Sequence, residues 1–71
     1  MNRKISLSLN VDADQKGQRI DVVVAKAFPE FSRNHLQKFI KEGTLKVNGK
    51  QTKAKKILEG NELIEIKATE T

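Results

Sequence analysis

The chain has 71 residues with no cysteine, 37% hydrophobic residues and 14 basic against 9 acidic residues, which gives a net charge of +5. A chain of this length forms one small domain, and the absence of cysteine excludes a disulfide framework and a thiolate metal site. Because the longest unbroken apolar run covers only residues 22–25, and the first residues lack a signal-peptide pattern, we expect a soluble, cytoplasmic protein.

The first predicted element is a strand over residues 5–11. Apolar and polar side chains alternate there with a period of two, as in a strand with one buried face. The apolar members are Ile5, Leu7, Leu9 and Val11. A polar stretch over residues 12–17 follows and predicts a loop.

A helix is predicted over residues 20–28. Asp21 lies in its first turn, where the positive end of the helix dipole favours a carboxylate, and Pro29 ends it. The apolar residues recur at three- and four-residue steps, which places them on one face: Ile20, Val23, Val24, Ala27 and Phe28.

A second helix is predicted between Ser32 and Gly43. Ser32 is a suitable N-cap, and Gly43 can adopt the left-handed conformation that ends many helices. Phe31, before the cap, can pack on Leu36 as a hydrophobic staple. The buried face consists of Leu36, Phe39 and Ile40, and the opposite polar face of Arg33, Asn34, Gln37, Lys38 and Lys41.

The rest of the chain predicts short strands. Asn48 and Gly49 tolerate the positive φ angles of a type I′ turn, so a hairpin is expected over residues 45–52. A basic stretch over residues 53–56 leads to a last strand over residues 63–67. Residues 68–71 have nothing to bury, and we expect them to fray or to begin a linker.

The predicted order of elements is β-α-α-β-β-β, which is an α+β fold. Two helices on one face of a small, mostly antiparallel sheet would bury the apolar stripes of both helices. We expect the first and last strands to be neighbours. The whole chain, residues 1–71, would be a single domain with an ordered core over about residues 5–66.

The positive charge is concentrated in the middle of the chain. Residues 31–56 have eight cations and one anion, a net +7, whereas residues 1–30 carry +1 and residues 57–71 carry −3. This distribution favours a polyanion as partner, and we expect the cations of residues 31–56 to form one continuous surface. A less favoured alternative is a basic module for an acidic protein or an anionic membrane.

Three segments resemble a known family, the S-four-type RNA-binding domain, also called the alpha-L motif. These are residues 17–21, 28–33 and 40–50, and the resemblance extends from about residue 5 to residue 66. The Gly-Gln-Arg start of the first segment and the Phe-Pro-Glu-Phe-Ser-Arg bend most resemble the N-terminal domain of bacterial large-subunit rRNA pseudouridine synthases.

The resemblance implies a two-helix alpha-L fold and a non-catalytic RNA-binding domain. Its second helix and hairpin would dock on structured RNA, with 23S-type large-subunit rRNA as the expected partner. Such a domain is expected to be monomeric, with no cofactor, metal or membrane partner, and the isomerase chemistry of a pseudouridine synthase would belong to a separate domain. A free-standing ribosome-associated protein of the same fold is the alternative.

The start of the second helix is the clearest candidate site. Arg33 lies at the first helical position, where the dipole disfavours a cation by about 0.3–1 kcal/mol. A phosphate would remove this penalty, because the Ser32 hydroxyl, free backbone N–H groups and the guanidinium can all donate to it. Arg19 faces RNA by resemblance, with a salt bridge to Asp21 or Glu30 as the alternative. The predicted RNA-binding residues are Arg19, Ser32, Arg33, Asn34, Gln37, Lys38, Lys41, Lys46, Lys50, Lys53, Lys55 and Lys56.

No catalytic or metal-binding residue is predicted. His35 is the only histidine, so neither a histidine-based triad nor a metal site can be assembled around it, and Asp21 is expected to serve the helix dipole. The phenylalanines belong to buried faces, which makes RNA shape and backbone the expected basis of recognition. Asn34 and His35 depart from the small or basic residues that are common in the family at these positions.

Overall fold

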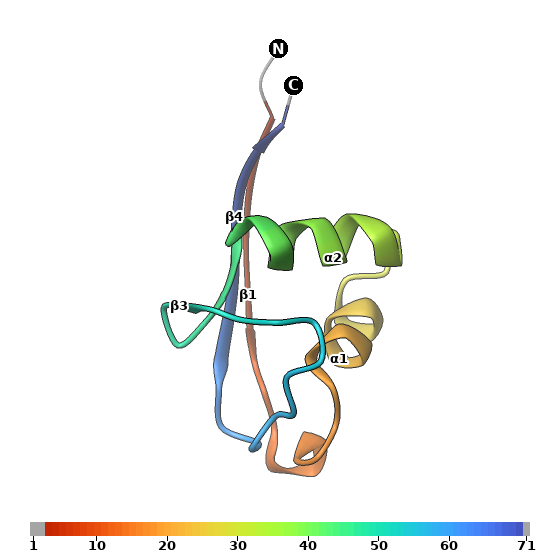
Figure 1. Cartoon of the computed structure of the whole chain (residues 1–71), viewed down its shortest axis with the longest axis vertical. Helices are drawn as coiled ribbons and strands as arrows, with labels where there is room; N and C mark the ends of the chain where they lie inside the picture. The colour runs from red at the N-terminus through yellow and green to blue at the C-terminus, as the bar shows by residue number, and fades with distance from the viewer. Residues whose placement is uncertain (1–2, 71) are drawn as a thin grey trace.

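The computed structural model describes residues 3–70 and confirms the α+β order (Figure 1). A short 3-10 helix, η1 (Ala13–Gln15), lies in the predicted loop after the first strand. The principal elements are β1 (Arg3–Asn10), α1 (Ile20–Ala27), α2 (Arg33–Glu42), β2 (Leu45–Val47), β3 (Lys50–Gln51) and β4 (Leu63–Glu70).

The four strands form one antiparallel sheet in the order β1-β4-β2-β3. The expected pairing of the first and last strands is confirmed, because β1 and β4 pair over their whole length, from Arg3 opposite Glu70 to Asn10 opposite Leu63. Each of these strands has eight residues. They form the longest feature of the molecule (Figure 1).

The predicted end of the last strand, at residue 67, is wrong. β4 continues through Ala68 and Thr69 to Glu70, because β1 supplies backbone partners for all three residues. Ala68 is half-buried and packs against the core. The described part of the expected frayed tail is therefore strand, and Thr71 lies outside the described residues.

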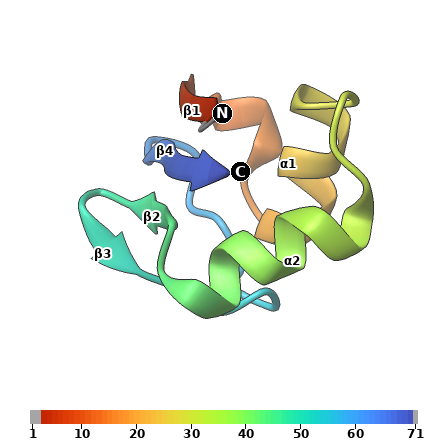
Figure 2. The same ribbon diagram turned by 90° about the horizontal axis from the view of Figure 1, so that it is seen from above.

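Both helices cover one face of the sheet (Figure 2). The alternation predicted for the first strand is present, since Ile5 is buried and Leu7 and Leu9 are half-buried against the core. The core joins both helical stripes to the inner face of β2 and β4. Its fully buried large side chains are Ile20, Val23, Val24, Leu36, Leu45, Leu58, Ile64 and Ile66.

The predicted limits of α2 are confirmed. The Ser32 Oγ accepts a hydrogen bond from the backbone N–H of His35 at 3.1 Å, and Gly43 ends the helix in the left-handed conformation with φ 80°. The predicted staple partner of Phe31 is Leu36. Phe31 is half-buried against the core to which Leu36 belongs, and its ring also contacts the rings of His35 and Phe39, whose centroids lie 5.2 Å and 5.5 Å away in edge-to-face geometry.

The hairpin between β2 and β3 has the predicted turn. Asn48 and Gly49 have φ angles of 51° and 79°, as a type I′ turn requires. Asn48 also ties the turn to the start of β4, because its Oδ1 accepts from the backbone N–H of Leu63 at 2.9 Å and its own N–H donates to the Leu63 carbonyl at 2.8 Å.

The segment after β3, residues 52–58, crosses from the hairpin to α1 (Figure 1). We call this segment the connector. Backbone hydrogen bonds fasten it to the first residue of α1 and to the residues before that helix. Ile20 N–H donates to the Lys56 carbonyl, Leu58 N–H to the Gln18 carbonyl, and Gly17 N–H to the Leu58 carbonyl, each at 2.9 Å. The lysines of the connector are therefore carried by a backbone that is held in place.

Candidate nucleic-acid interface

The connector separates two hollows on the surface. The helix-side hollow, about 510 Å³, lies between α2 and the connector and is lined by Arg19, Gln37, Ile40, Lys41, Gln51, Thr52, Lys53, Ala54 and Lys55. The hairpin-side hollow, about 850 Å³, lies between the connector and the hairpin and is lined by Val47, Asn48, Lys50, Gln51, Thr52, Lys53, Lys55, Lys56, Glu59 and Glu62. Because four residues line both hollows, the two form neighbouring parts of one surface.

The helix-side hollow is strongly cationic. Its four cations come from three places in the fold: Arg19 from the residue before α1, Lys41 from the last turn of α2, and two lysines from the connector. None of its lining residues, all within the described part of the chain, is acidic. Gln51 Nε2 donates to the Lys41 carbonyl at 3.2 Å and so links the end of α2 to the chain that leads into the connector.

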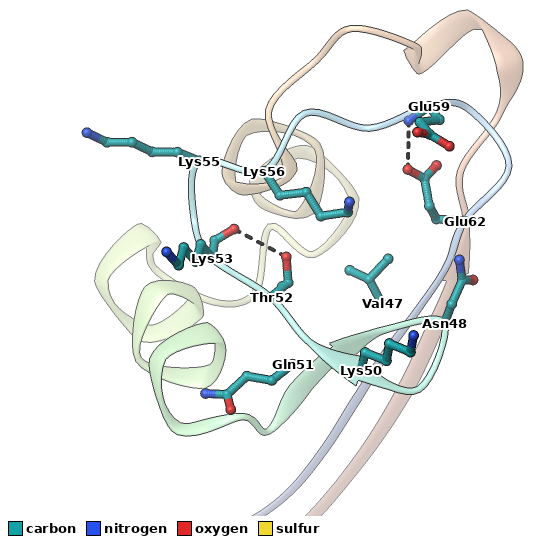
Figure 3. A pocket seen from close by; sticks show the side chains of 10 residues that line it. All are labelled: Val47, Asn48, Lys50, Gln51, Thr52, Lys53, Lys55, Lys56, Glu59 and Glu62. Atoms are coloured by element: carbon teal, nitrogen blue, oxygen red, sulfur yellow. Dashed lines mark hydrogen bonds between the residues drawn. The ribbon is translucent and has the colours of Figure 1, made fainter.

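The hairpin-side hollow combines both signs of charge (Figure 3). Figure 3 shows the Lys56 side chain directed into it and the Lys55 side chain directed away on the opposite side of the connector. Lys50 lies along the hairpin edge of the same hollow, and Glu59 and Glu62 lie at its other end. The acidic end makes this hollow less favourable for a polyanion than the helix-side hollow.

One of the two acidic residues at that end, Glu62, is hydrogen-bonded to the backbone. Glu62 is only 4% exposed, and its carboxylate accepts hydrogen bonds from the N–H groups of Glu59, Gly60 and Asn61. Burial alone would raise the pKa of Glu62, but these hydrogen bonds to the ionised form outweigh burial and lower the pKa below its ordinary value of 4.5. Glu62 thus stays ionised and serves the turn over residues 59–61.

Arg19 forms the salt bridge that was the alternative to RNA contact. Its Nη2 lies 2.8 Å from Asp21 Oδ2 and its Nε lies 3.2 Å from Asp21 Oδ1. Asp21 is buried, whereas 47% of the Arg19 side chain remains exposed. The ion pair therefore does not remove Arg19 from the surface, because the same side chain lines the helix-side hollow.

Two of the residues predicted for α2 and its cap, Gln37 and Lys41, line the helix-side hollow. The others lie outside both hollows: Ser32, Arg33, Asn34 and Lys38. Arg33 is exposed one helical turn before Gln37, and Gln37 lies one turn before Lys41, so the three form one stripe along α2. The stripe extends the rim of the helix-side hollow towards the start of α2. Asn34 and Lys38 are exposed farther around the helix.

The structure separates Lys46 from the other predicted lysines. Its neighbours Leu45 and Val47 are buried on the face that the helices cover, so the strand alternation places Lys46 on the opposite face. Lys46 lies opposite Glu65 in the sheet and lines a separate hollow with Glu65 and Lys67. The expected single surface is therefore interrupted at Lys46, because every second residue of β2 faces away from α2.

Both hollows are also lined by two residues that were not among the predicted RNA-binding residues, Gln51 and Thr52. Their position at the end of the hairpin was the available signal, because Gln51 ends β3 and Thr52 begins the connector. The direction in which the chain continues, however, depends on the connector's hydrogen bonds to the start of α1 and to the residues before it. The spacing of two residues between Arg19 and Asp21 indicated that an ion pair could form. It did not indicate how much of the Arg19 side chain would remain exposed.

Within residues 3–70, no three histidine, cysteine, aspartate or glutamate side chains group into a metal site. The His35 ring lies 4.6 Å from the Phe39 ring, centroid to centroid, as part of an aromatic cluster on the edge of α2. In the same range, no helix is both long enough and hydrophobic enough to cross a membrane.

Comparison with known proteins gives one family and a set of relatives. The family model that matches, described as S4 domain, covers residues 18–64. A protein of Aquifex aeolicus described as an uncharacterized RNA pseudouridine synthase is 36% identical over 63 residues, which is 86% of this chain and 20% of the relative.

Two further relatives are each described as ribosomal large subunit pseudouridine synthase D. The one from Yersinia pestis is 38% identical over 69 residues, 96% of this chain and 21% of the relative. The one from Haemophilus influenzae is 42% identical over 65 residues, 89% of this chain and 20% of the relative. The chain thus spans about a fifth of the length of the relatives that it matches.

Proposed function

The chain belongs to the S4 domain family, and from this premise we propose that it is an RNA-docking domain that binds structured large-subunit rRNA. The observation that carries the proposal is the helix-side hollow. It gathers Arg19, Lys41, Lys53 and Lys55 from separate parts of the chain, and its lining residues in the described part of the chain include no acid. Such a convergence of cations is suited to a phosphate backbone.

Binding would rest on phosphates and shape. The stripe from Arg33 to Lys41 runs along α2 into the hollow, so an RNA backbone can follow the helix and continue over the connector. Phe28 and Phe39 are buried, and the half-buried Phe31 packs against the core, so stacking of aromatic side chains on bases would contribute little. The domain would therefore position an RNA by its backbone and fold, with little reading of base edges.

The relatives favour a role beside a modifying enzyme. Their printed names describe pseudouridine synthases of the ribosomal large subunit, and they are about five times as long as this chain. The proposed role of this domain in the cytoplasm is to hold rRNA, while isomerisation of uridine belongs to a separate catalytic domain. These relatives favour that role over a free-standing ribosome-associated protein.

The salt dependence of RNA affinity tests the proposal. We expect the affinity of the chain for in vitro transcribed large-subunit rRNA to fall about 100-fold between about 50 and 200 mM salt if about five phosphates are engaged. Fluorescence anisotropy on the labelled chain would measure this fall.

A matched measurement with vesicles that contain phosphatidylserine separates RNA from a membrane surface. Affinity for rRNA that is independent of salt, or vesicle binding as tight as rRNA binding at equal phosphate concentration, would contradict the proposal. Competition by an acidic peptide as effective as competition by unlabelled rRNA would contradict it in favour of a protein partner.

A further inference from the structure

Both the backbone and the guanidinium of Arg19 are held in place at the edge of the helix-side hollow. Its backbone forms a β-bridge with Ile57 of the connector, and its guanidinium forms two contacts with the Asp21 carboxylate. Asp21 itself is 7% exposed and lies in the first turn of α1, whose apolar side is packed in the core. The direction of the Arg19 side chain is therefore determined by the fold.

The ion pair is poorly explained as a device for stability alone. Nearly half of the Arg19 side chain is exposed, and ion pairs at exposed positions contribute little to stability. Meanwhile Lys41, Lys53 and Lys55 line the same hollow and repel Arg19. An anion in the hollow would relieve that repulsion, and a guanidinium held in one orientation can donate to it without being immobilised first.

The lining of the hollow suits a phosphate better than a base. Lysine and arginine side chains only donate hydrogen bonds, whereas base edges present both donors and acceptors. The Gln51 amide nitrogen is already bonded to the Lys41 carbonyl. Gln37, Gln51 and Thr52 also bring acceptor oxygens to the lining, but its four cations only donate, and a negatively charged phosphodiester oxygen matches those four.

We propose that the helix-side hollow seats one RNA phosphate, and that Asp21 is a positioning residue that holds the Arg19 guanidinium ready to bind it. This inference rests on the proposed function, because it names which group of the RNA enters the hollow. It also assigns a purpose to a buried acid in the midst of a basic surface.

The test is whether Asp21→Asn strengthens or weakens the binding of rRNA. Asp21→Asn removes a negative charge beside the RNA, which by charge alone would strengthen binding. If Asp21 positions Arg19, the same change weakens binding to transcribed large-subunit rRNA about threefold to tenfold and lowers the salt slope by about one. Anisotropy titrations at several salt concentrations would measure both quantities.

Asp14→Asn is the matched control. Asp14 is exposed in η1, and its substitution removes the same charge without touching Arg19. We expect rRNA affinity within about twofold of the original chain, unchanged or tighter, and an unchanged salt slope. In an Arg19→Gln background, Asp21→Asn should no longer weaken binding, because the residue through which it acts is gone.

Arg19→Lys guards against a loss of folding in the aspartate variant. It keeps the charge but loses the planar fork, and we expect it to weaken rRNA binding by a similar factor with an unchanged melting temperature. Tighter binding by a folded Asp21→Asn variant, or binding by Arg19→Lys equal to that of the original chain, would overturn the positioning role. Affinity of the original chain that does not respond to salt would instead refute the proposed function, and the phosphate seat with it.

Discussion

The Glu62 side chain acts as an internal anion for the turn that precedes β4. Three consecutive backbone N–H groups point at its carboxylate, at distances of 2.6–3.0 Å. Backbone donors so arranged bind anions in many proteins, and here the anion belongs to the same chain. The lowered pKa follows from this arrangement and has a consequence for the pH dependence of stability.

We predict that Glu62→Gln lowers the free energy of unfolding by about 1–3 kcal/mol at pH 7, because an amide cannot accept all of these bonds as a carboxylate does. The folded pKa of Glu62 lies below its unfolded value, so its contribution is present above about pH 4.5 and is lost as the pH falls through the folded pKa. Urea unfolding at pH 7 and at lower pH would show the gap between variant and original chain narrowing.

Glu59→Gln is the control for this prediction. The Glu59 side chain is exposed, and only its backbone N–H serves the turn, so we expect a change within about 0.5 kcal/mol. A gap between Glu62→Gln and the original chain that stays constant at acidic pH would show that the carboxylate charge does not support the turn.

Single residues with a strong local preference were predictable from the sequence. Ser32 and Gly43 cap α2 as expected, because capping depends on the residue and its immediate neighbours. Arg19 was ambiguous between RNA and Asp21. Local spacing indicates that an ion pair can form, but the exposure of Arg19 and its place in a hollow depend on the connector, which is more than 30 residues away along the chain.

At the scale of elements, the hairpin between β2 and β3 depends on the backbone of its turn. Gly49 has a φ of 79°, and a Cβ added there would meet nothing within 4 Å. Substitution would therefore introduce backbone strain without a steric clash. The turn matters for the interface because β3 leads directly into the connector.

We predict that Gly49→Ala lowers the free energy of unfolding by about 1–2 kcal/mol, the usual cost of a left-handed conformation with a Cβ. Gly60→Ala should cost more, because its φ is 104° and its Cβ would also lie 3.0 Å from the Ala13 Cα. Lys50→Ala, at an exposed position of β3, is the control and should change stability by less than about 0.5 kcal/mol. Equal denaturation midpoints for all three variants would disprove this order.

The length of β4 was not predictable from its own residues. Ala68, Thr69 and Glu70 lack the apolar alternation that marks Leu63 to Lys67, so the sequence pattern favours an earlier end. Their pairing is decided by β1, which offers a ladder as far as Arg3. A partner strand far away in the sequence thus extends an element that local signals would end.

At the scale of the whole molecule, the fold sorts the lysines of residues 31–56 onto two faces. The connector places Lys53 and Lys55 on the helix-side hollow, and the alternation of β2 sends Lys46 to the opposite face. The sequence indicates how many cations this region holds. It does not indicate that Lys46 lies on the opposite face from the other cations, because that depends on which residues of β2 face the helices.

This distribution can be tested by removing two positive charges from either face and comparing the effect on rRNA binding. Lys53→Gln with Lys55→Gln should lower the salt slope of rRNA affinity by at least about one and weaken binding at low salt. Lys46→Gln with Lys67→Gln removes the same charge from the opposite face and should leave the slope nearly unchanged. Anisotropy titrations of both variants would compare the slopes, and equal losses would indicate diffuse attraction without a defined interface.

The long pairing of β1 with β4 determines how the domain can be held. Arg3 lies opposite Glu70 at one tip of the two-stranded ribbon, which extends past α2 in a body that measures 39 × 21 × 17 Å (Figure 1). The connector crosses nearer the other end of the ribbon. A fluorophore or surface tether joined to the chain at this tip would therefore lie away from the helix-side hollow. Chains immobilised in this way should retain their full capacity to bind rRNA.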